Sequence, residues 1–176
     1  MLFRSADPPQ TDTRCGMNER TNPITAAGYA ALRAEYGRLF ADERPKIVEI
    51  VSWAAGNGDR SENGDYIYGK QKLRAIDRDL GRLSKKMKAA NIIDPAKQPD
   101  RSRVFFGATV TIADEQDNQR TVTLIGDDEQ DVSLGRIGWS SPLARSLKGA
   151  SVGDLRIVTL PAGPKEWEVI AISYPD

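Results

Sequence analysis

A short glycine-rich stretch between two long helical patterns is the feature that most constrains the fold. It extends from Gly56 to Tyr66 and carries carboxylates at Asp59, Glu62 and Asp65. Because the break has room only for a turn, we expect the two helices to fold back on each other as a hairpin. The carboxylates would then lie together at its tip.

The first helical pattern begins after Thr25, whose hydroxyl can accept a hydrogen bond from a free amide of the first turn. Its apolar residues are spaced as in a heptad seam, at Tyr29, Leu32, Tyr36 and Leu39. A second register takes over around Pro45 and consists of Phe40, Ile47, Val51 and Ala54. We therefore expect Pro45 to kink or re-phase this helix rather than to end it.

The second helical pattern is more regular. Its seam alternates steps of three and four residues through Tyr66, Gly69, Leu73, Ile76, Leu80, Leu83, Met87 and Ala90. Only Gly69 weakens it, at a cost of about 1 kcal/mol relative to alanine. With about 25 residues per arm at ~1.5 Å each, the two patterns predict an antiparallel coiled coil about 40 Å long. Such a rod serves as a spacer, as a dimerisation element, or to carry its tip where a globular body cannot enter.

The composition restricts the chemistry available to this tip. The chain has no histidine and a single cysteine, Cys15. This excludes Ser-His and Cys-His nucleophile pairs, an internal disulfide and a cysteine-cluster zinc site. Any chemistry in this protein must therefore rest on carboxylates, Lys, Arg, Tyr or Ser. No apolar run approaches the about 20 residues that span a bilayer, so we expect a cytoplasmic protein without membrane contact.

A formal net charge of zero hides an asymmetry between the two halves. Residues 1–99 contain 17 Lys and Arg against 13 acidic residues, whereas residues 100–176 contain 8 against 12. Part of the positive charge recurs every four residues along the second helix, at Lys70, Arg74, Arg78, Arg82 and Lys86. This stripe is either a solvated face or a surface for phosphates or an acidic protein groove.

The apolar period changes from helical to two after a proline-containing linker at residues 93–103. We expect strands at Val104–Ile112, Arg120–Ile125, Leu155–Leu160 and Trp167–Tyr174, because these segments are rich in β-branched and aromatic residues. A short helix is expected at Pro142–Leu147, with Ser141 as its N-cap.

These elements predict an α+β fold with an antiparallel sheet and one short helix in its second half. The predicted organisation is a disordered leader (1–23), a hairpin domain (24–92) with its acidic tip at 58–65, the linker, and a C-terminal domain (104–176).

Asp59 and Glu62 have two interpretations on spacing alone. They match a capping box, in which Asp59 is the N-cap of the second helix and Glu62 lies at N3. Alternatively, two carboxylates one turn apart form half of a site for a hard divalent cation such as Mg²⁺. Ser61 and Asn63 could orient a water or a phosphate there. The remaining ligands of such a site have to come from elsewhere.

The tip sequence Gly58–Tyr66 resembles that of the bacterial transcript-cleavage factors GreA and GreB, and the GreB type more closely because of Asp59–Asn63. Further motifs are similar to the same family, both in the second half of the chain and upstream of the tip: Ser140–Leu147, Val152–Asp154, Glu43–Pro45 and Trp53–Ala55. The resemblance covers residues 23–175.

This resemblance implies that the coiled coil enters the secondary channel of RNA polymerase, while an FKBP-like C-terminal domain binds near the rim. Asp59 and Glu62, supported by Ser61 and Asn63, would help to hold a Mg²⁺ shared with the polymerase, which then cleaves the 3′ end of a backtracked RNA. The factor itself would be a monomer without enzymatic activity or a tightly bound cofactor.

The resemblance also suggests contact surfaces. We expect the nascent RNA to meet Lys70, Arg74, Arg78 and Arg82, and the polymerase to meet Ser141, Pro142, Leu143 and Arg145, although Leu143 and Leu147 could instead pack into the domain's own core. One alternative is a channel-binding regulator that lacks cleavage-stimulating activity, although the intact Asp59 and Glu62 pair favours cleavage. A prolyl isomerase with a dimerisation arm rests on fold resemblance alone.

Overall fold

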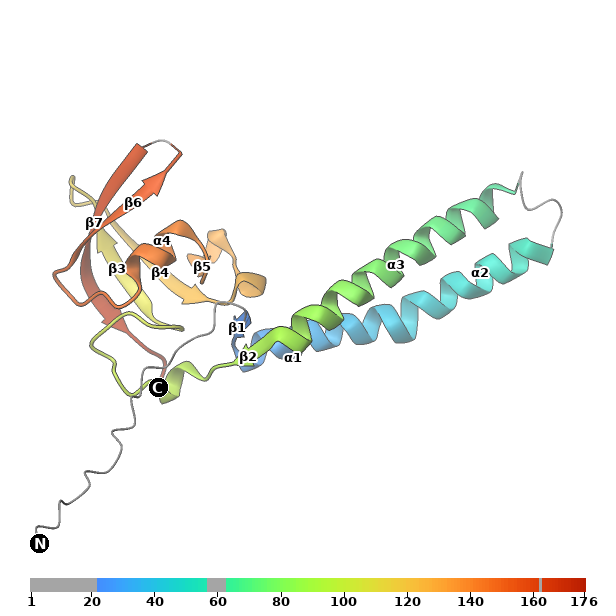
Figure 1. Ribbon diagram of the computed structural model, residues 1–176, viewed down its shortest axis with the longest axis horizontal. Helices are drawn as coiled ribbons and strands as arrows, with labels where there is room; N and C mark the ends of the chain where they lie inside the picture. The colour runs from blue at the N-terminus through green and yellow to red at the C-terminus, as the bar shows by residue number, and fades with distance from the viewer. Residues whose placement is uncertain (1–21, 57–62, 162) are drawn as a thin grey trace, which may run out of the picture.

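The computed structural model describes residues 22–56, 63–161 and 163–176, and consists of a helical hairpin joined to a small β domain (Figure 1). The predicted α+β fold class is confirmed. One arm of the hairpin is formed by α1 (Ala26–Gly37), the π-helix η1 (Arg38–Glu43) and α2 (Arg44–Gly56), and the other by α3 (Gly64–Ala89). At 26 residues, α3 is about 40 Å long.

The first arm begins as predicted, because the Thr25 hydroxyl accepts a hydrogen bond from the amide of Gly28 (3.0 Å). The prediction that Pro45 shifts the register of its apolar seam is wrong. The helix runs through Pro45 without a break, and η1 performs the shift, since its wider turn inserts one extra residue between buried Leu39 and buried Ile47. Phe40, which was assigned to the second register, is 57% exposed for the same reason.

The seam between the two arms is a small apolar core. Leu39 and Ile47 of the first arm pack with Ile76, Leu80 and Leu83 of α3. An ion pair between Arg44 Nε and Asp77 Oδ1 (2.8 Å) joins the arms at the surface. Gly69 is buried in this seam, and a Cβ at that position would lie 2.6 Å from Cγ2 of Val51. The glycine therefore allows α2 and α3 to approach closely and does not merely weaken the helix.

The base of the hairpin is closed by a pair of short strands that the sequence patterns do not predict. β1 (Asn22–Ile24) lies parallel to β2 (Ala90–Ile92), with Ile24 opposite Ile92. Ile24 is fully buried. Asn22 and Pro23, which were assigned to the leader, thus belong to the hairpin base, while the rest of the leader lies outside the described residues.

The β domain follows the 3₁₀ turn η2 (Pro95–Lys97), and its described residues form five strands, with turns η3 (Asp127–Glu129) and η4 (Val132–Leu134) between β4 and β5. The strands lie in the order β5-β4-β3-β7-β6 and all neighbours are antiparallel except β4 and β5, so the sheet is mixed rather than purely antiparallel. Their bounds are β3 Thr109–Ala113, β4 Gln119–Ile125, β5 Arg136–Gly138, β6 Leu155–Leu160 and β7 Gly163–Ser173.

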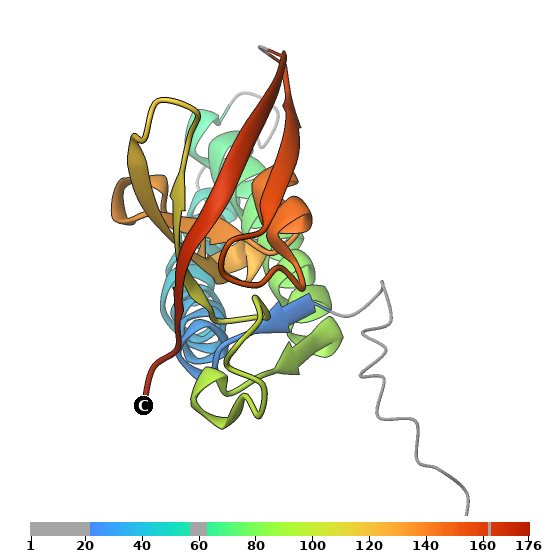
Figure 2. The same cartoon turned by 90° about the vertical axis from the view of Figure 1, so that its left-hand side faces the viewer.

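Two predicted elements of this domain agree with the structure, and two strands differ. β6 and the helix α4 (Pro142–Leu147) have the predicted bounds, and Ser141 caps α4. β3 starts five residues later than predicted, because Gly107 has a φ of +83° and lies against Pro95, which interrupts an extended strand. β7 starts earlier than predicted and forms a long hairpin with β6 that extends beyond the rest of the sheet (Figure 2).

The core of the β domain lies between the sheet and α4. Its fully buried members include Val104, Ile112, Leu124, Leu147 and Val169. Within the part of the chain that the structure describes, this core and the apolar seam of the hairpin share no residue. The two halves are therefore two separately packed units.

Candidate functional site

The free end of the hairpin is organised by Asn63. Its side-chain oxygen accepts hydrogen bonds from the amides of Asp65 (3.1 Å) and Tyr66 (3.3 Å), so Asn63 is the N-cap of α3. Its side-chain nitrogen donates to the carbonyl of Ala54 near the end of α2 (3.0 Å). A single carboxamide thus starts one arm of the hairpin and ties it to the other.

The predicted capping box is wrong, because α3 starts after Asn63 and its N-cap is not Asp59. Asp59, Ser61 and Glu62 themselves lie outside the described residues. Asp65 is exposed in the first turn of α3, where the helix dipole favours a negative charge. Within the described segments, no group of three or more His, Cys, Asp or Glu side chains is arranged to hold a metal ion.

Large apolar side chains are exposed close to this end of the hairpin. Trp53 is 68% exposed and Ile50 is 47% exposed, and both line an open pocket of about 430 Å³ together with Glu49 and Asp65. The surface behind the tip is therefore both apolar and acidic. Ile50 and Trp53 lie outside the apolar register predicted for this arm, and that position was the available sign that they face outward.

The predicted basic stripe lies on the exposed surface of α3. Lys70, Arg74, Arg78 and Arg82 are all exposed. Lys70 lies over the ring of Tyr66, 5.3 Å from its centre, and Arg82 pairs with Asp79 (3.1 Å). Among the described residues, Arg74 and Arg78 have no comparable contact. Lys86, the last member of the stripe, instead pairs with Asp128 of the β domain.

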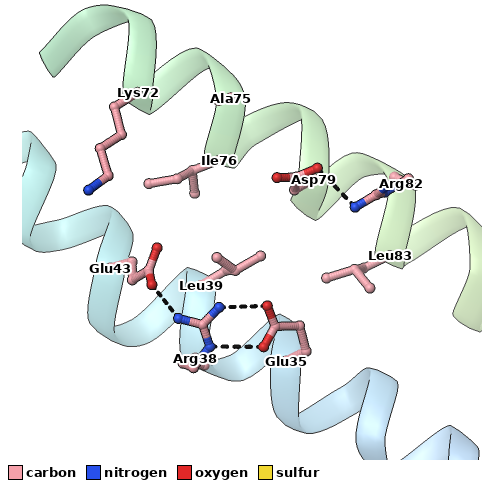
Figure 3. A pocket seen from close by; sticks show the side chains of 10 residues that line it. All are labelled: Glu35, Arg38, Leu39, Glu43, Lys72, Ala75, Ile76, Asp79, Arg82 and Leu83. Carbon is pink, nitrogen blue, oxygen red and sulfur yellow. Dashed lines mark hydrogen bonds and ion pairs between the residues drawn. The ribbon is translucent and has the colours of Figure 1, made fainter. Parts of the chain in front are cut away.

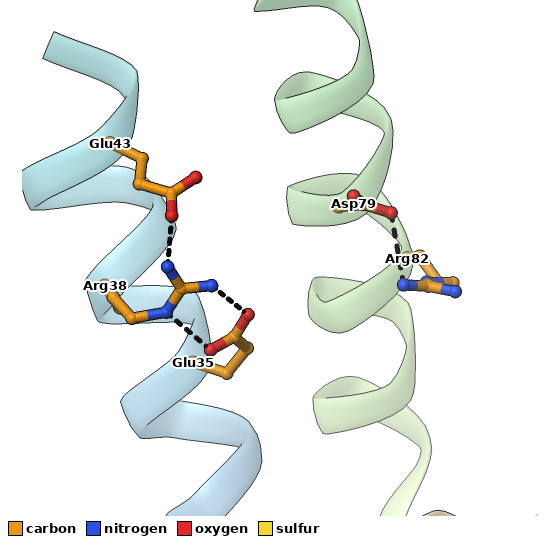
Figure 4. Close-up of polar contacts among 5 residues, drawn as sticks. All are labelled: Glu35, Arg38, Glu43, Asp79 and Arg82. Atoms are coloured by element: carbon orange, nitrogen blue, oxygen red, sulfur yellow. Dashed lines mark hydrogen bonds and ion pairs between the residues drawn. The ribbon is translucent and has the colours of Figure 1, made fainter. Parts of the chain in front are cut away.

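A groove of about 330 Å³ lies between the first arm and α3 on the surface of the hairpin, next to this stripe (Figure 3). Leu39, Ile76 and Leu83 form its apolar floor. On its wall, the guanidinium of Arg38 donates two hydrogen bonds to Glu35 (2.6 and 2.8 Å) and one to Glu43 (Figure 4). The hydrogen bonds from Arg38 lower the pKa of Glu35.

These paired charges have a structural explanation. Glu43 lies five residues after Arg38, which is the hydrogen-bond spacing of a π-helix, so the ion pair spans η1. Arg38, Glu35 and Glu43 are thus engaged with one another and stabilise the re-phased segment.

The residues predicted to bind the polymerase lie on α4 or form its N-cap, and they differ in how far they are exposed. Pro142 and Arg145 are exposed, and the Ser141 hydroxyl accepts from the amide of Ala144 (3.3 Å). Leu143 is half-buried against the core of the β domain, and Leu147 is fully buried in it. Beside them, Lys148 Nζ lies 4.0 Å from the centre of the Trp139 ring. Partial burial, together with the nearby Arg145, lowers the pKa of Lys148.

Two residues of the β domain that the sequence patterns did not identify contact the base of the hairpin. Glu129 accepts a hydrogen bond from the amide of Thr25 (2.9 Å), and Asp128 accepts one from the side chain of Asn22 (2.8 Å). Both come from an acidic run, residues 127–129, and these two hydrogen bonds join residues about a hundred positions apart. An acidic run in a sequence does not indicate which distant residues its side chains contact.

Comparison with known proteins covers both halves of the chain. Residues 22–92 match the family model described as "Transcription elongation factor, N-terminal", and residues 98–174 match "Transcription elongation factor, GreA/GreB, C-term". The transcription elongation factor GreB of Neisseria meningitidis serogroup B is 47% identical over 156 residues, which are 89% of this chain and 96% of that protein. The transcription elongation factor GreA of Hyphomonas neptunium is 43% identical, over 86% and 97% of the two chains.

Among solved structures, the GreA factor homolog Gfh1 of Thermus thermophilus aligns with a TM-score of 0.41 and 22% identity, over 88% of this chain and 99% of that one. No helix in the described segments is long and apolar enough to cross a membrane. The two family models together span nearly all of the described residues. The chain belongs to the GreA/GreB family of transcription elongation factors.

Proposed function

We propose that this elongation factor rescues arrested transcription by inserting its hairpin into the secondary channel of RNA polymerase, where it stimulates cleavage of the 3′ end of backtracked RNA. One observation carries the proposal. α2 ends at Gly56 and α3 begins at Gly64 at the end of the rod that lies away from the β domain (Figure 1), so the acidic sequence Asp59–Asp65 is joined to the far end of a long, narrow support.

In this proposal Asp59 and Glu62 hold a Mg²⁺ together with groups of the polymerase. Carboxylate oxygens are ligands that Mg²⁺ prefers, and two of them make only a partial site, which is suited to a cation shared between two proteins. Such a cation supplies an activated water for phosphodiester hydrolysis. The part of this chain is to present the carboxylates, for which Asn63 fixes the start of α3 and links it to Ala54.

The test is a cleavage assay on a stalled, backtracked elongation complex. We expect Asp59→Asn and Glu62→Gln each to lower the rate of 3′ fragment release by about tenfold or more, equivalent to about 1.4 kcal/mol or more of transition-state stabilisation. Both variants should still compete with the wild-type chain for the polymerase, because the β domain is unchanged. Asp65→Asn is the matched control, since Asp65 is an exposed carboxylate on the same helix terminus.

Cleavage at the wild-type rate by both variants would overturn the role of the carboxylates. A wild-type chain that binds polymerase and slows nucleotide addition without releasing RNA fragments would instead identify a channel-blocking regulator.

A further inference from the structure

We propose that Asp128 and Glu129 are positioning residues, which lock the hairpin in one direction relative to the β domain so that the tip and the polymerase-binding surface act as one rigid body. The inference rests on the proposed function, because it concerns where the tip is delivered. The set of residues that form this contact, called the joint below, is Asn22, Thr25, Gly28, Lys86, Gly126, Asp128 and Glu129.

Glu129 completes the N-terminal cap of α1 from the other domain. Its Oε2 accepts hydrogen bonds from the amides of Thr25 (2.9 Å) and Gly126 (3.3 Å), and its Oε1 accepts from the Thr25 hydroxyl. That hydroxyl in turn accepts from the amide of Gly28. A carboxylate at a helix N-terminus also interacts favourably with the helix dipole. The β domain thus holds the first arm by the end of its helix.

Asp128 holds both sides of the hairpin base at once. Its Oδ2 accepts from Asn22 of β1 (2.8 Å), and its Oδ1 pairs with Lys86 near the end of α3. Its side chain is only 12% exposed. Burial alone would raise the pKa of Asp128, but the hydrogen bonds from Lys86 and Asn22 outweigh burial and leave this pKa below its ordinary value. The carboxylate is therefore charged at neutral pH and bonded to both β1 and α3.

Two glycines make this contact possible. A Cβ on Gly28 would lie 2.3 Å from the carboxyl carbon of Glu129, and a Cβ on Gly126 would lie 2.6 Å from the carbonyl oxygen of Pro23. The backbone of α1 at Gly28 therefore lies directly against the Glu129 side chain, and the backbone at Gly126 lies directly against that of β1. The close approach restricts rotation as well as separation.

These contacts decide the direction of the hairpin because no continuous core does. The apolar cores of the two halves share no residue. A cavity of about 360 Å³ lies beside the joint, between Leu32 and Leu83 of the hairpin and Arg136 of the β domain. Two domains joined without a large apolar interface are expected to move relative to each other. Buried Ile24 and the polar contacts around Asp128 and Glu129 are what oppose that motion here.

The length of the rod makes a small rotation costly. A tilt of about 10° at the base of a rod about 40 Å long displaces its end by about 7 Å. Catalytic groups tolerate far less, since a misplacement of about 1 Å can lower a rate about a hundredfold. Loosening the joint should therefore lower the maximal rate of cleavage more than it weakens binding through the β domain.

The experiment measures direction and activity in the same variants. Spin labels at Gln71→Cys on α3 and Gln119→Cys on β4, in a Cys15→Ser background, report the distance between the two halves; both positions are exposed. We expect one narrow distance distribution for the otherwise wild-type chain and a broad one for Asp128→Ala/Glu129→Ala. In the cleavage assay, the double variant should lose about tenfold in rate at saturating concentration, while its half-saturating concentration changes by less than about threefold.

Two further variants separate positioning from general damage. Asp131→Ala is the matched control, because Asp131 is a nearby carboxylate whose bond to the amide of Ser133 (3.0 Å) stays within the β domain. This variant should leave both the distance distribution and the maximal rate of cleavage unchanged. Glu129→Gln, tested with Asp128 intact, keeps an acceptor for Thr25 and should remain close to wild type.

An unchanged distance distribution in the double variant would overturn the proposal that Asp128 and Glu129 fix the direction of the hairpin. A broad distribution with an undiminished maximal rate would overturn its positioning role. If the wild-type chain itself stimulates no cleavage, it is the proposed function that fails, and the distance measurement still decides whether the joint fixes the hairpin.

Discussion

Asn63 joins the ends of the two arms with one side chain, which caps α3 and donates to Ala54 of α2. The tip sequence offers several residues that could start a helix, among them Asp59, Ser61 and Asn63. The spacing of Asp59 and Glu62 favoured the first, yet the helix begins after Asn63. Asn63 also contacts Ala54, and such a tertiary interaction leaves no mark in local spacing.

Replacing Asn63 should loosen the free end of the hairpin. We expect Asn63→Ala to lower the free energy of unfolding by about 1–2 kcal/mol, because the cap of α3 is lost. Asn63→Asp should have a smaller effect, since a carboxylate still accepts from Asp65 and Tyr66 although it loses the bond to Ala54. Urea unfolding measures the free energy, and hydrogen exchange of the Asp65 and Tyr66 amides locates the change. Wild-type protection of these amides in Asn63→Ala would contradict the capping role.

The two arms illustrate what helical periodicity can and cannot predict. The seam of α3 was predictable because it needs only local spacing, and Ile76, Leu80 and Leu83 are buried as expected. The π-helix in the first arm was not predictable. The change of register that it causes lies close to Pro45 in the sequence, and a proline offers an equally good explanation for such a change. Gly69 was read as a weak point from its helix propensity, whereas its role depends on Val51 across the seam. Packing between arms is invisible to a one-dimensional pattern.

Two glycines of α3 should respond in opposite directions to the same substitution. Gly64→Ala should stabilise the hairpin by up to about 1 kcal/mol, because no atom of the described residues, apart from its chain neighbours and the nearby backbone of α3, lies within 4 Å of the added methyl group. Gly69→Ala should destabilise it by about 1–2 kcal/mol, because the methyl group meets the stiff Val51 side chain. Val51→Ala in the Gly69→Ala background should restore part of the loss in a thermal unfolding cycle. Equal stabilisation by both glycine substitutions would refute close packing at Gly69.

The basic stripe of α3 can be tested as a unit. Arg74→Glu/Arg78→Glu should lower cleavage of long backtracked RNAs by about fivefold or more, with a smaller effect at high salt, because contacts to phosphates are screened by ions. Arg33→Glu/Lys46→Glu, which reverses two exposed charges on the first arm, is the control for net charge. Equal cleavage by the two double variants across RNA lengths would identify the stripe as a solvated surface.

At the scale of the whole molecule, the order of the parts was predictable and their relative placement was not. The change of apolar period separated a hairpin from a β domain, and the two family matches meet in the same region of the chain. The contact between Thr25 and Glu129 spans 104 residues and uses side chains that are ordinary at the surface of any protein. No local rule distinguishes Glu129 from the other acidic residues of its turn. At the tip, spacing alone left Asp59 and Glu62 between a helix cap and half of a cation site, and the resemblance to a family favoured the cation site.

The buried strand at the base should be essential for this placement. We expect Ile24→Ala to lower the free energy of unfolding by about 2–5 kcal/mol, because Ile24 is fully buried between the hairpin and the β domain. Ile92→Ala is the matched control, since Ile92 pairs with Ile24 but is 52% exposed, and it should cost less than about 0.5 kcal/mol. Calorimetry of the two variants measures the difference. A similar loss in both would contradict the role of Ile24 burial in stabilising the base.

The pairing of β1 with β2 has a further consequence for how such proteins can vary. The chain enters and leaves the hairpin at neighbouring points, with Asn22 opposite Ala90. Equal insertions of seven residues into α2 and α3 would therefore carry the tip about 10.5 Å farther and leave every contact of the base in place. Depth of penetration and place of anchorage are thus separately adjustable, and either can be exchanged by grafting a hairpin of different length onto the same β domain.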